Sequence, residues 1–159
     1  MKNILLSSFL AGSFMLALPA FSEISFTKGK LELPFKPAIS IKKSTLKAKE
    51  KTELSVDFKL EEQSYIYKES LSINISNKDI KNENPIYPSS EKKHDTFSKK
   101  EKEIYSKDFS IKIPVSVLEK SSAKKTNISV TVGFQGCSLK RGICFLPQKK
   151  TLSIPVEIK

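Results

Sequence analysis

The chain of 159 residues carries 28 Lys or Arg against 17 Asp or Glu, which gives a formal net charge of +11. A chain this basic raises the question of nucleic-acid binding. Its lysines, however, are interspersed with acidic residues, and Arg141 is the sole arginine. This composition is more typical of solvated sheet faces and of strand edges protected against aggregation. We therefore expect no nucleic-acid partner.

Residues 1–22 have the layout of a secretory signal peptide. A lysine lies near the start, an apolar stretch runs from Ile4 to Leu18, and the small residues of "LPAFS" precede a cut before Glu23. The alternative is an uncleaved membrane anchor, but the apolar stretch is shorter than the ~20 residues that a spanning helix needs. We expect an exported, periplasmic protein in which residues 23–159 form one domain.

Most of this domain alternates apolar and polar residues with a period of two, and no segment has a convincing helical stripe. Each alternating segment presents one apolar face and one polar face, which is typical of antiparallel sheets that cover a core. The pattern predicts an all-β, immunoglobulin-like sandwich of two packed sheets. The segments are 52–60, 70–76, 108–117, 127–134 and 151–158, with a weaker strand expected within 38–48.

Residues 76–103 interrupt the alternation with proline, asparagine, serine and many charges, so we predict a long loop there. Loops of this length in a small domain are usually functional or mobile. Phe97 is an isolated aromatic residue among these charges. An exposed phenyl ring gains nothing from water, so we expect Phe97 to cover another part of the molecule.

The only two cysteines, Cys137 and Cys144, flank a short segment that contains Gly142, a residue suited to a turn with positive φ. We expect both to lie near the mouth of a hairpin, where Cα atoms ~5.5 Å apart can be bridged. In an oxidising compartment this pair is expected to form a disulfide.

Two roles for the disulfide remain open on these grounds. The first is a structural cross-link, although closing so short a loop contributes under ~3 kcal/mol. The second is a redox-active pair, since a short exposed bridge is easily reduced. The nearby positive charges of Lys140, Arg141, Lys149 and Lys150 favour a thiolate, but exposed charges are screened.

The segment "VGFQGCSLKRGICFLPQKKTLSI" resembles the cysteine segment of the N-terminal domain of the bacterial thiol:disulfide interchange protein DsbD. In that family a strand ends Tyr-Gln-Gly-Cys and is followed by a short loop and Gly-X-Cys-Tyr-Pro-Pro. "SYIYKESLSINI" and "DTFSKKEKEIYSKDFSIKIPV" are similar to further family segments, the second containing a cap-loop phenylalanine. Six residues separate the cysteines here, where five are expected. One family proline is displaced to Pro147, and Ser98 stands where the family has tyrosine.

The resemblance implies an immunoglobulin-like sandwich that carries a redox-active pair under a cap loop. Cys144 would be the nucleophile that forms a mixed disulfide, Cys137 would resolve it, and Phe97 would shield the pair. Asp95 and either Tyr65 or Tyr67 would be neighbours that tune the thiols, although ordinary strand packing accounts for the tyrosines equally well.

By the same resemblance, a thioredoxin-like donor or a separate membrane electron carrier would reduce the pair, and oxidised periplasmic thiol proteins would be the acceptors. Isomerase recycling and cytochrome c maturation are both open as pathways. The sequence stops at "IPVEIK", so we expect this domain to be encoded alone. We also expect it to be a monomer without a cofactor.

The sequence allows two other interpretations. His94, the sole histidine, together with Asp95 and the cysteines suggests a zinc site, but the paired Cys/His spacing of such sites is absent, so we expect no metal. The competing function is an exported immunoglobulin-like binding or adhesion module whose disulfide is purely structural.

Overall fold

The computed structural model describes residues 32–119 and 124–159, and the predicted signal peptide lies outside the described residues. Within these ranges the chain forms strands and one short 3₁₀ turn, η1 (Lys68–Ser70), and no helix there is long and apolar enough to cross a membrane. The strands are β1 (Phe35–Ile41), β2 (Thr45–Leu46), β3 (Lys51–Leu60), β4 (Ser64–Tyr67), β5 (Ser72–Ser76), β6 (Ile80–Asn82), β7 (Glu91–Asp95), β8 (Lys100–Tyr105), β9 (Phe109–Val117), β10 (Lys124–Phe134), β11 (Gly136–Ser138), β12 (Ile143–Cys144) and β13 (Gln148–Ile158).

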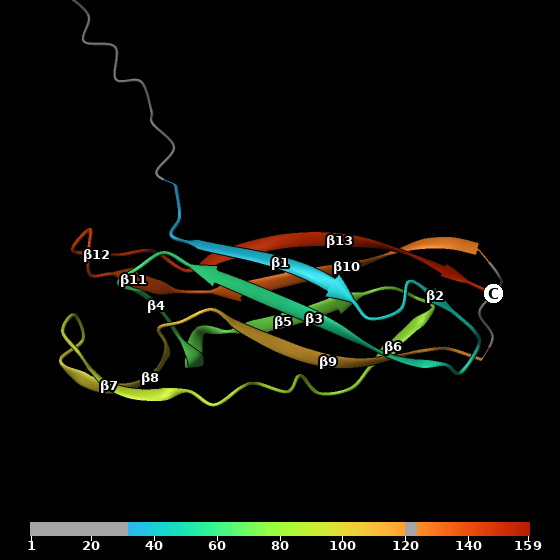
Figure 1. The fold of residues 1–159 in the computed structure, drawn as a ribbon, viewed down its shortest axis with the longest axis horizontal. Coiled ribbons are helices and arrows are strands. Elements are labelled where there is room, and N and C mark those ends of the chain that lie inside the picture. The colour runs from blue at the N-terminus through green and yellow to red at the C-terminus, as the bar shows by residue number, and fades with distance from the viewer. Residues whose placement is uncertain (1–31, 120–123) are drawn as a thin grey trace, which may run out of the picture. The chain divides into compact units, whose positions relative to one another are not determined.

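Two four-stranded sheets form the sandwich, with strand orders β1-β3-β9-β6 and β2-β13-β10-β5 (Figure 1). The pairings are antiparallel except that β2 runs parallel to β13. One apolar cluster fills the space between the sheets, because the alternating side chains of β3, β9, β10 and β13 turn inward. Its members include Leu54, Val56, Phe58, Ile111, Ile113, Val115, Ile128, Val130, Val132, Val156 and Ile158. The predicted all-β sandwich is thus confirmed.

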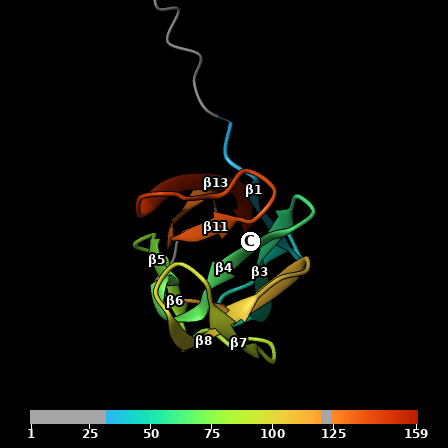
Figure 2. The ribbon, with the colours of Figure 1, turned by 90° about the vertical axis from the view of Figure 1, so that its left-hand side faces the viewer.

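A third sheet lies at one end of the sandwich, which the sequence did not predict. Its five strands are ordered β12-β11-β4-β8-β7 and pair antiparallel. Figure 1 shows these strands gathered at one end of the molecule, and Figure 2 views them from that end. We call this the end sheet. Both cysteines and the β7–β8 hairpin belong to it.

The five strongly alternating segments are all strands. The weaker strand expected within 38–48 is part of β1, which ends at Ile41, and a separate short strand, β2, begins at Thr45. Residues 76–103 are not a continuous loop: they contain β6, β7 and most of β8. In β7 and β8 most side chains are charged and exposed, and the two strands pair through their backbones, with Lys92 opposite Glu103 and Lys93 opposite Lys102. Such strands have no apolar alternation that a sequence pattern would reveal.

Candidate redox site

The predicted disulfide is formed between Cys137 on β11 and Cys144 on β12, which are directly opposite one another. Their Cα atoms are 3.9 Å apart, closer than the expected ~5.5 Å. The Phe145 amide donates to the Gly136 carbonyl at 2.9 Å, so the cysteines occupy a non-hydrogen-bonded position of the ladder. Cα atoms approach most closely at such positions.

The two cysteines differ sharply in exposure. Cys137 is 0% exposed and packs with Tyr65, Tyr67 and Ile104 in a small buried cluster of the end sheet. Cys144 lies on the outermost strand and is exposed. The disulfide therefore has one covered residue and one residue that a partner can reach.

Gly136 allows β11 to lie where it does. A Cβ at this position would come within 2.2 Å of the Tyr65 carbonyl oxygen and 2.7 Å of the Phe35 ring. Backbone atoms cannot yield as a flexible side chain can, so the close approach of β4 and β11 requires glycine here. The glycine of the Gln-Gly-Cys motif thus has a physical role in placing Cys137.

Ser70 secures the point at which the chain passes from β10 of the sandwich into β11 of the end sheet. Its hydroxyl accepts from the Gln135 amide at 2.8 Å and lies 2.7 Å from the Tyr67 carbonyl, to which it donates. The Tyr67 amide in turn donates to the Gln135 carbonyl at 3.0 Å. Sequence reasoning missed Ser70, because no pattern distinguishes a serine that joins two strands from any other turn serine.

Tyr67 contacts both sulfur atoms. Its hydroxyl lies 3.2 Å from Cys137 Sγ and 3.9 Å from Cys144 Sγ. A disulfide sulfur carries no proton, so the phenol is the donor. Burial is the main influence that raises the pKa of Tyr67, which keeps the hydroxyl protonated at neutral pH.

Tyr65 and Asp95 form a second polar contact close to Tyr67. The Tyr65 hydroxyl donates to the buried Asp95 carboxylate, and the rings of Tyr65 and Tyr67 meet edge to face at 5.5 Å. Burial, followed by the bond to Asp95, raises the pKa of Tyr65. For Asp95 burial opposes ionisation, but hydrogen bonds from Ser98 and Tyr65 outweigh it and lower the pKa to about 2. The carboxylate therefore stays charged.

Asp95 also fixes the turn that carries Phe97. The Ser98 amide donates to the Asp95 carboxylate at 2.6 Å, and the Lys99 amide donates to the Asp95 carbonyl at 2.8 Å. Phe97 lies in the turn between β7 and β8 at the cysteine-bearing end, and 42% of it is exposed. Asp95 thus links the turn to Tyr65, and through the tyrosine pair to the disulfide.

The positive charges near the cysteines are not all free. The Arg141 guanidinium pairs with the Glu61 carboxylate at 2.8 Å and donates to the Glu32 carbonyl at 2.6 Å. Its charge is therefore offset, whereas Lys140, Lys149 and Lys150 are exposed. Lys140 lies in the turn between β11 and β12, and Lys149 and Lys150 lie near the start of β13, a few residues after Cys144.

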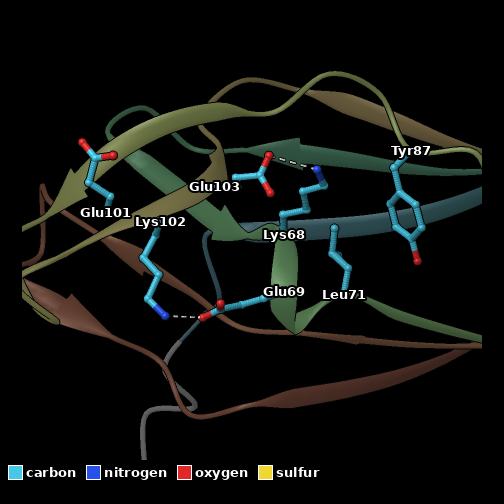
Figure 3. A pocket seen from close by; sticks show the side chains of 7 residues that line it. All are labelled: Lys68, Glu69, Leu71, Tyr87, Glu101, Lys102 and Glu103. Carbon is cyan, nitrogen blue, oxygen red and sulfur yellow. Dashed lines mark hydrogen bonds and ion pairs between the residues drawn. The ribbon is translucent and has the colours of Figure 1, made fainter.

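Two other features lie outside the disulfide site. His94 is an exposed residue of β7 opposite Glu101, and within the described ranges no group of three His, Cys, Asp or Glu side chains is arranged for a metal. Figure 3 shows an open pocket of about 520 Å³ beside η1 and β8, crossed by the ion pairs Lys68–Glu103 and Lys102–Glu69. Four of its five charged side chains belong to these two pairs, and the fifth is Glu101.

The fold and the site together define a class: an immunoglobulin-like sandwich whose end sheet holds one cross-strand disulfide beside a tyrosine hydroxyl. The family model described as "Thiol:disulfide interchange protein DsbD, N-terminal" matches residues 32–155. The chain belongs to this family.

Two solved structures share the fold. The Neisseria meningitidis DsbD N-terminal domain in the reduced form has a TM-score of 0.54 and 16% identity, covering 78% of this chain and 86% of that chain. The DsbD N-terminal domain in complex with the PilB N-terminal domain, also from Neisseria meningitidis, has a TM-score of 0.55 and 18% identity, covering 79% and 88%. No curated protein matches the sequence.

Proposed function

We propose that this domain carries reducing equivalents between proteins of the periplasm by opening and closing the Cys137–Cys144 disulfide. A thioredoxin-like protein or a membrane carrier would be the donor, and oxidised exported thiol proteins would be the acceptors. Membership of the thiol:disulfide interchange family supports this function. The complex of the Neisseria domain with a PilB domain supports a protein, rather than a small molecule, as the partner.

The observation that carries the proposal is the unequal exposure of the two cysteines. A donor thiolate attacks the reachable Cys144 sulfur, the Cys137–Cys144 bond breaks, and Cys137 leaves as a thiolate. The second donor thiolate then attacks the mixed disulfide and releases Cys144 as a thiolate. The donor is left oxidised to a disulfide, and two electrons have entered the domain.

Delivery runs through the same sulfur. The Cys144 thiolate attacks an acceptor disulfide, and the acceptor's second cysteine leaves as a thiolate. Cys137 then attacks the Cys144 sulfur, which restores the internal disulfide and releases the acceptor's first thiolate. The acceptor gains the two electrons, and its thiolates take up protons from water.

Tyr67 is proposed to assist the thiolate states. When Cys144 is attacked, negative charge develops on the buried Cys137 sulfur, and the Tyr67 hydroxyl lies 3.2 Å away as a donor. A hydrogen bond to a charged sulfur is stronger than one to a neutral group. Asp95 acts one step away, because its charge holds Tyr65 beside Tyr67.

The Phe97 turn is proposed to be the cap that shields the pair and moves aside when a partner docks. The turn belongs to the same end sheet, in which β4 separates β8 from the cysteine strand β11, and Asp95 at the base of the turn bonds to Tyr65; these observations support the role. Shielding protects a reduced pair from irreversible oxidation. Residues 1–22 are proposed to direct export, with the mature chain beginning at Glu23.

The test combines a redox titration with trapping in a periplasmic extract. A relay should have a potential in the region of about −270 to −180 mV, whereas a structural cross-link should resist reduction to below about −300 mV. The Cys137→Ala variant should accumulate mixed disulfides through Cys144. The matched Cys144→Ala variant should trap far fewer, because its remaining cysteine is covered. A potential below about −300 mV with no trapped species would favour the binding module with a structural disulfide.

A further inference from the structure

Two turns project from the cysteine-bearing end of the molecule (Figure 1). One is the β7–β8 turn, residues 96–99, and the other is the β11–β12 turn, residues 139–142. Each carries one large apolar side chain in solvent, because Phe97 is 42% exposed and Leu139 is 40% exposed. We call these two the tip turns. A single exposed apolar side chain is ordinary, so the role of the tip turns depends on what surrounds them.

The segments that contain the tip turns hold most of the net charge of the chain. Residues 92–100 include four lysines and one acid, Asp95, and residues 136–150 include three lysines, Arg141 and no acid. These two segments therefore contribute +7 of the formal net charge of +11. Positive charge is concentrated at the same end of the molecule as the two exposed apolar side chains.

The lysines of these segments are available to a ligand. All seven are exposed, and none forms an ion pair with a described residue. Two of the acidic residues nearby are already engaged, because the Asp95 carboxylate is buried and the Glu61 carboxylate pairs with Arg141. Glu91 and Glu101 remain exposed on the β7–β8 hairpin, which leaves the lysines in excess.

This composition fits the surface of a lipid bilayer with negatively charged headgroups. Such a surface attracts lysines and accepts apolar side chains at the boundary between headgroups and acyl chains. An acidic protein would also attract the lysines, but the core of a protein interface gathers its apolar side chains in one patch. Here β4 and β8 lie between β11 and β7, so the two tip turns belong to separate parts of the end sheet. A bilayer can receive both turns at once.

We propose that the tip turns bind the surface of an anionic lipid bilayer. Phe97 and Leu139 enter the headgroup region, and the lysines contact lipid phosphates. Each lysine near such a surface strengthens binding about five-fold. Because Cys144 lies on β12, which begins directly after the β11–β12 turn, docking brings the disulfide to the membrane surface, where a membrane electron carrier would meet it. The docking itself does not depend on the proposed exchange function.

The test is sedimentation with phospholipid vesicles. It uses the oxidised, exported chain after removal of residues 1–22, so that the apolar stretch of that segment does not bind lipid. The chain should bind vesicles that contain phosphatidylglycerol, bind phosphatidylcholine vesicles far more weakly, and be released by salt. A triple variant at the tip turns, with Lys99→Gln, Lys100→Gln and Lys140→Gln, should bind the anionic vesicles about a hundredfold more weakly.

A second triple variant removes the same charge from the opposite end of the sandwich, with Lys42→Gln, Lys47→Gln and Lys78→Gln. These lysines are exposed and lie beside β2 and β6 (Figure 1). Its binding should fall by less than about five-fold, because salt screens distant charges. Equal losses in the two triple variants would show attraction by net charge alone and would overturn the site. Absence of binding to anionic vesicles would also overturn it and leave the exchange function untouched, since the assay transfers no electrons.

Tryptophan substitution tests whether the Phe97 ring enters lipid, because the chain has no tryptophan of its own. In Phe97→Trp, anionic vesicles should shift the emission to shorter wavelength and reduce quenching by acrylamide. Leu118→Trp is the matched control, because Leu118 is 41% exposed just beyond the end of β9, and its emission should not change. An unchanged signal from Phe97→Trp would overturn insertion of the ring.

Polyglutamate tests the competing occupant. Binding of polyglutamate, but not of anionic vesicles, with the same loss in the triple variant at the tip turns would assign this surface to an acidic protein, and the lipid proposal would be wrong. Preference for the vesicles at equal salt concentration supports the bilayer.

Discussion

The sandwich and the end sheet hold their strands together by different means. In the sandwich, alternating aliphatic side chains from two sheets form one large apolar cluster. The buried cluster of the end sheet has only four members, two of which are tyrosines and one the covered cysteine. Buried polar groups are stable only when hydrogen-bonded, and here Tyr65, Tyr67 and Asp95 satisfy that condition. The sandwich thus supplies stability, and the end sheet places polar groups around a reactive bond.

Matched phenylalanine truncations test this division most strongly. Phe58 in the sandwich is 1% exposed and stacks on Phe109 at 4.9 Å. Phe58→Ala should lower the free energy of unfolding by about 3–5 kcal/mol, through lost burial and the cavity left behind. Phe97→Ala in the β7–β8 turn should change it by under about 0.5 kcal/mol. Guanidinium denaturation of both variants measures the difference.

The same two variants should rank in the opposite order for reactivity. Removing the Phe97 ring should speed reduction of the disulfide by dithiothreitol, while Phe58→Ala should leave that rate near the wild-type value under conditions in which it remains folded. Phe97→Ala could instead lose much of its stability without any gain in reduction rate. That result would show that the Phe97 ring is part of a stabilising core, and it would contradict the proposed difference between the sandwich and the end sheet.

Alanine at Gly136, where β11 begins, should have the next largest effect on the free energy of unfolding. Gly136→Ala drives a Cβ into the Tyr65 carbonyl and the Phe35 ring, and should cost about 2–3 kcal/mol through overpacking. Gly142→Ala is the matched control: its φ is +65°, but nothing lies within 4 Å of a new Cβ, so about 1 kcal/mol of backbone strain is expected. Thermal unfolding of both variants tests the ranking. A Gly142→Ala variant as unstable as Gly136→Ala would show that close approach is not the constraint.

The sandwich could be predicted from sequence because its strands alternate clearly. Ile111, Ile113 and Val115 are separated by polar residues, and this spacing alone places them on one face. The end sheet gave no such signal. Its strands are two to six residues long, β4 is buried on both faces, and β7 and β8 consist mainly of exposed charged residues. A window that searches for alternation finds nothing in these strands.

The candidate site also has features that the sequence predicted and features that only the structure revealed. Cysteine chemistry and the family motif were enough to single out Cys137, Cys144 and the neighbouring tyrosines. Two facts required coordinates: that Tyr67, rather than Tyr65, reaches the sulfurs, and that Asp95 accepts a hydrogen bond from Tyr65. Register determines both, because β4 must pair with β11 in one particular alignment. The register of these two strands cannot be read from the sequence.

The pH dependence of the free energy of unfolding tests the buried polar contacts of Asp95 in the end sheet, and its expected effect is the smallest. The folded-state pKa of Asp95 is about 2, below its ordinary 3.8, so between these values the unfolded chain binds more protons. The stabilisation is therefore complete above about pH 5 and is lost as the pH falls, by about 1 kcal/mol at pH 3 and about 2 kcal/mol at pH 2. Asp95→Asn cannot titrate, so its stability should fall less steeply than that of the wild type over this window.

Tyr65→Phe sharpens this measurement because it removes a single donor to the carboxylate and keeps the ring. The pKa of Asp95, followed by NMR titration, should rise part of the way toward its ordinary value, since the Ser98 bond remains. The stability curve should then lie between those of the wild type and Asp95→Asn. Parallel curves for all three proteins between pH 2 and pH 5 would mean that the carboxylate gains nothing from its partners. The Asp95–Tyr65 contact would then be packing alone, and the link from the Phe97 turn to the disulfide would lose its electrostatic basis.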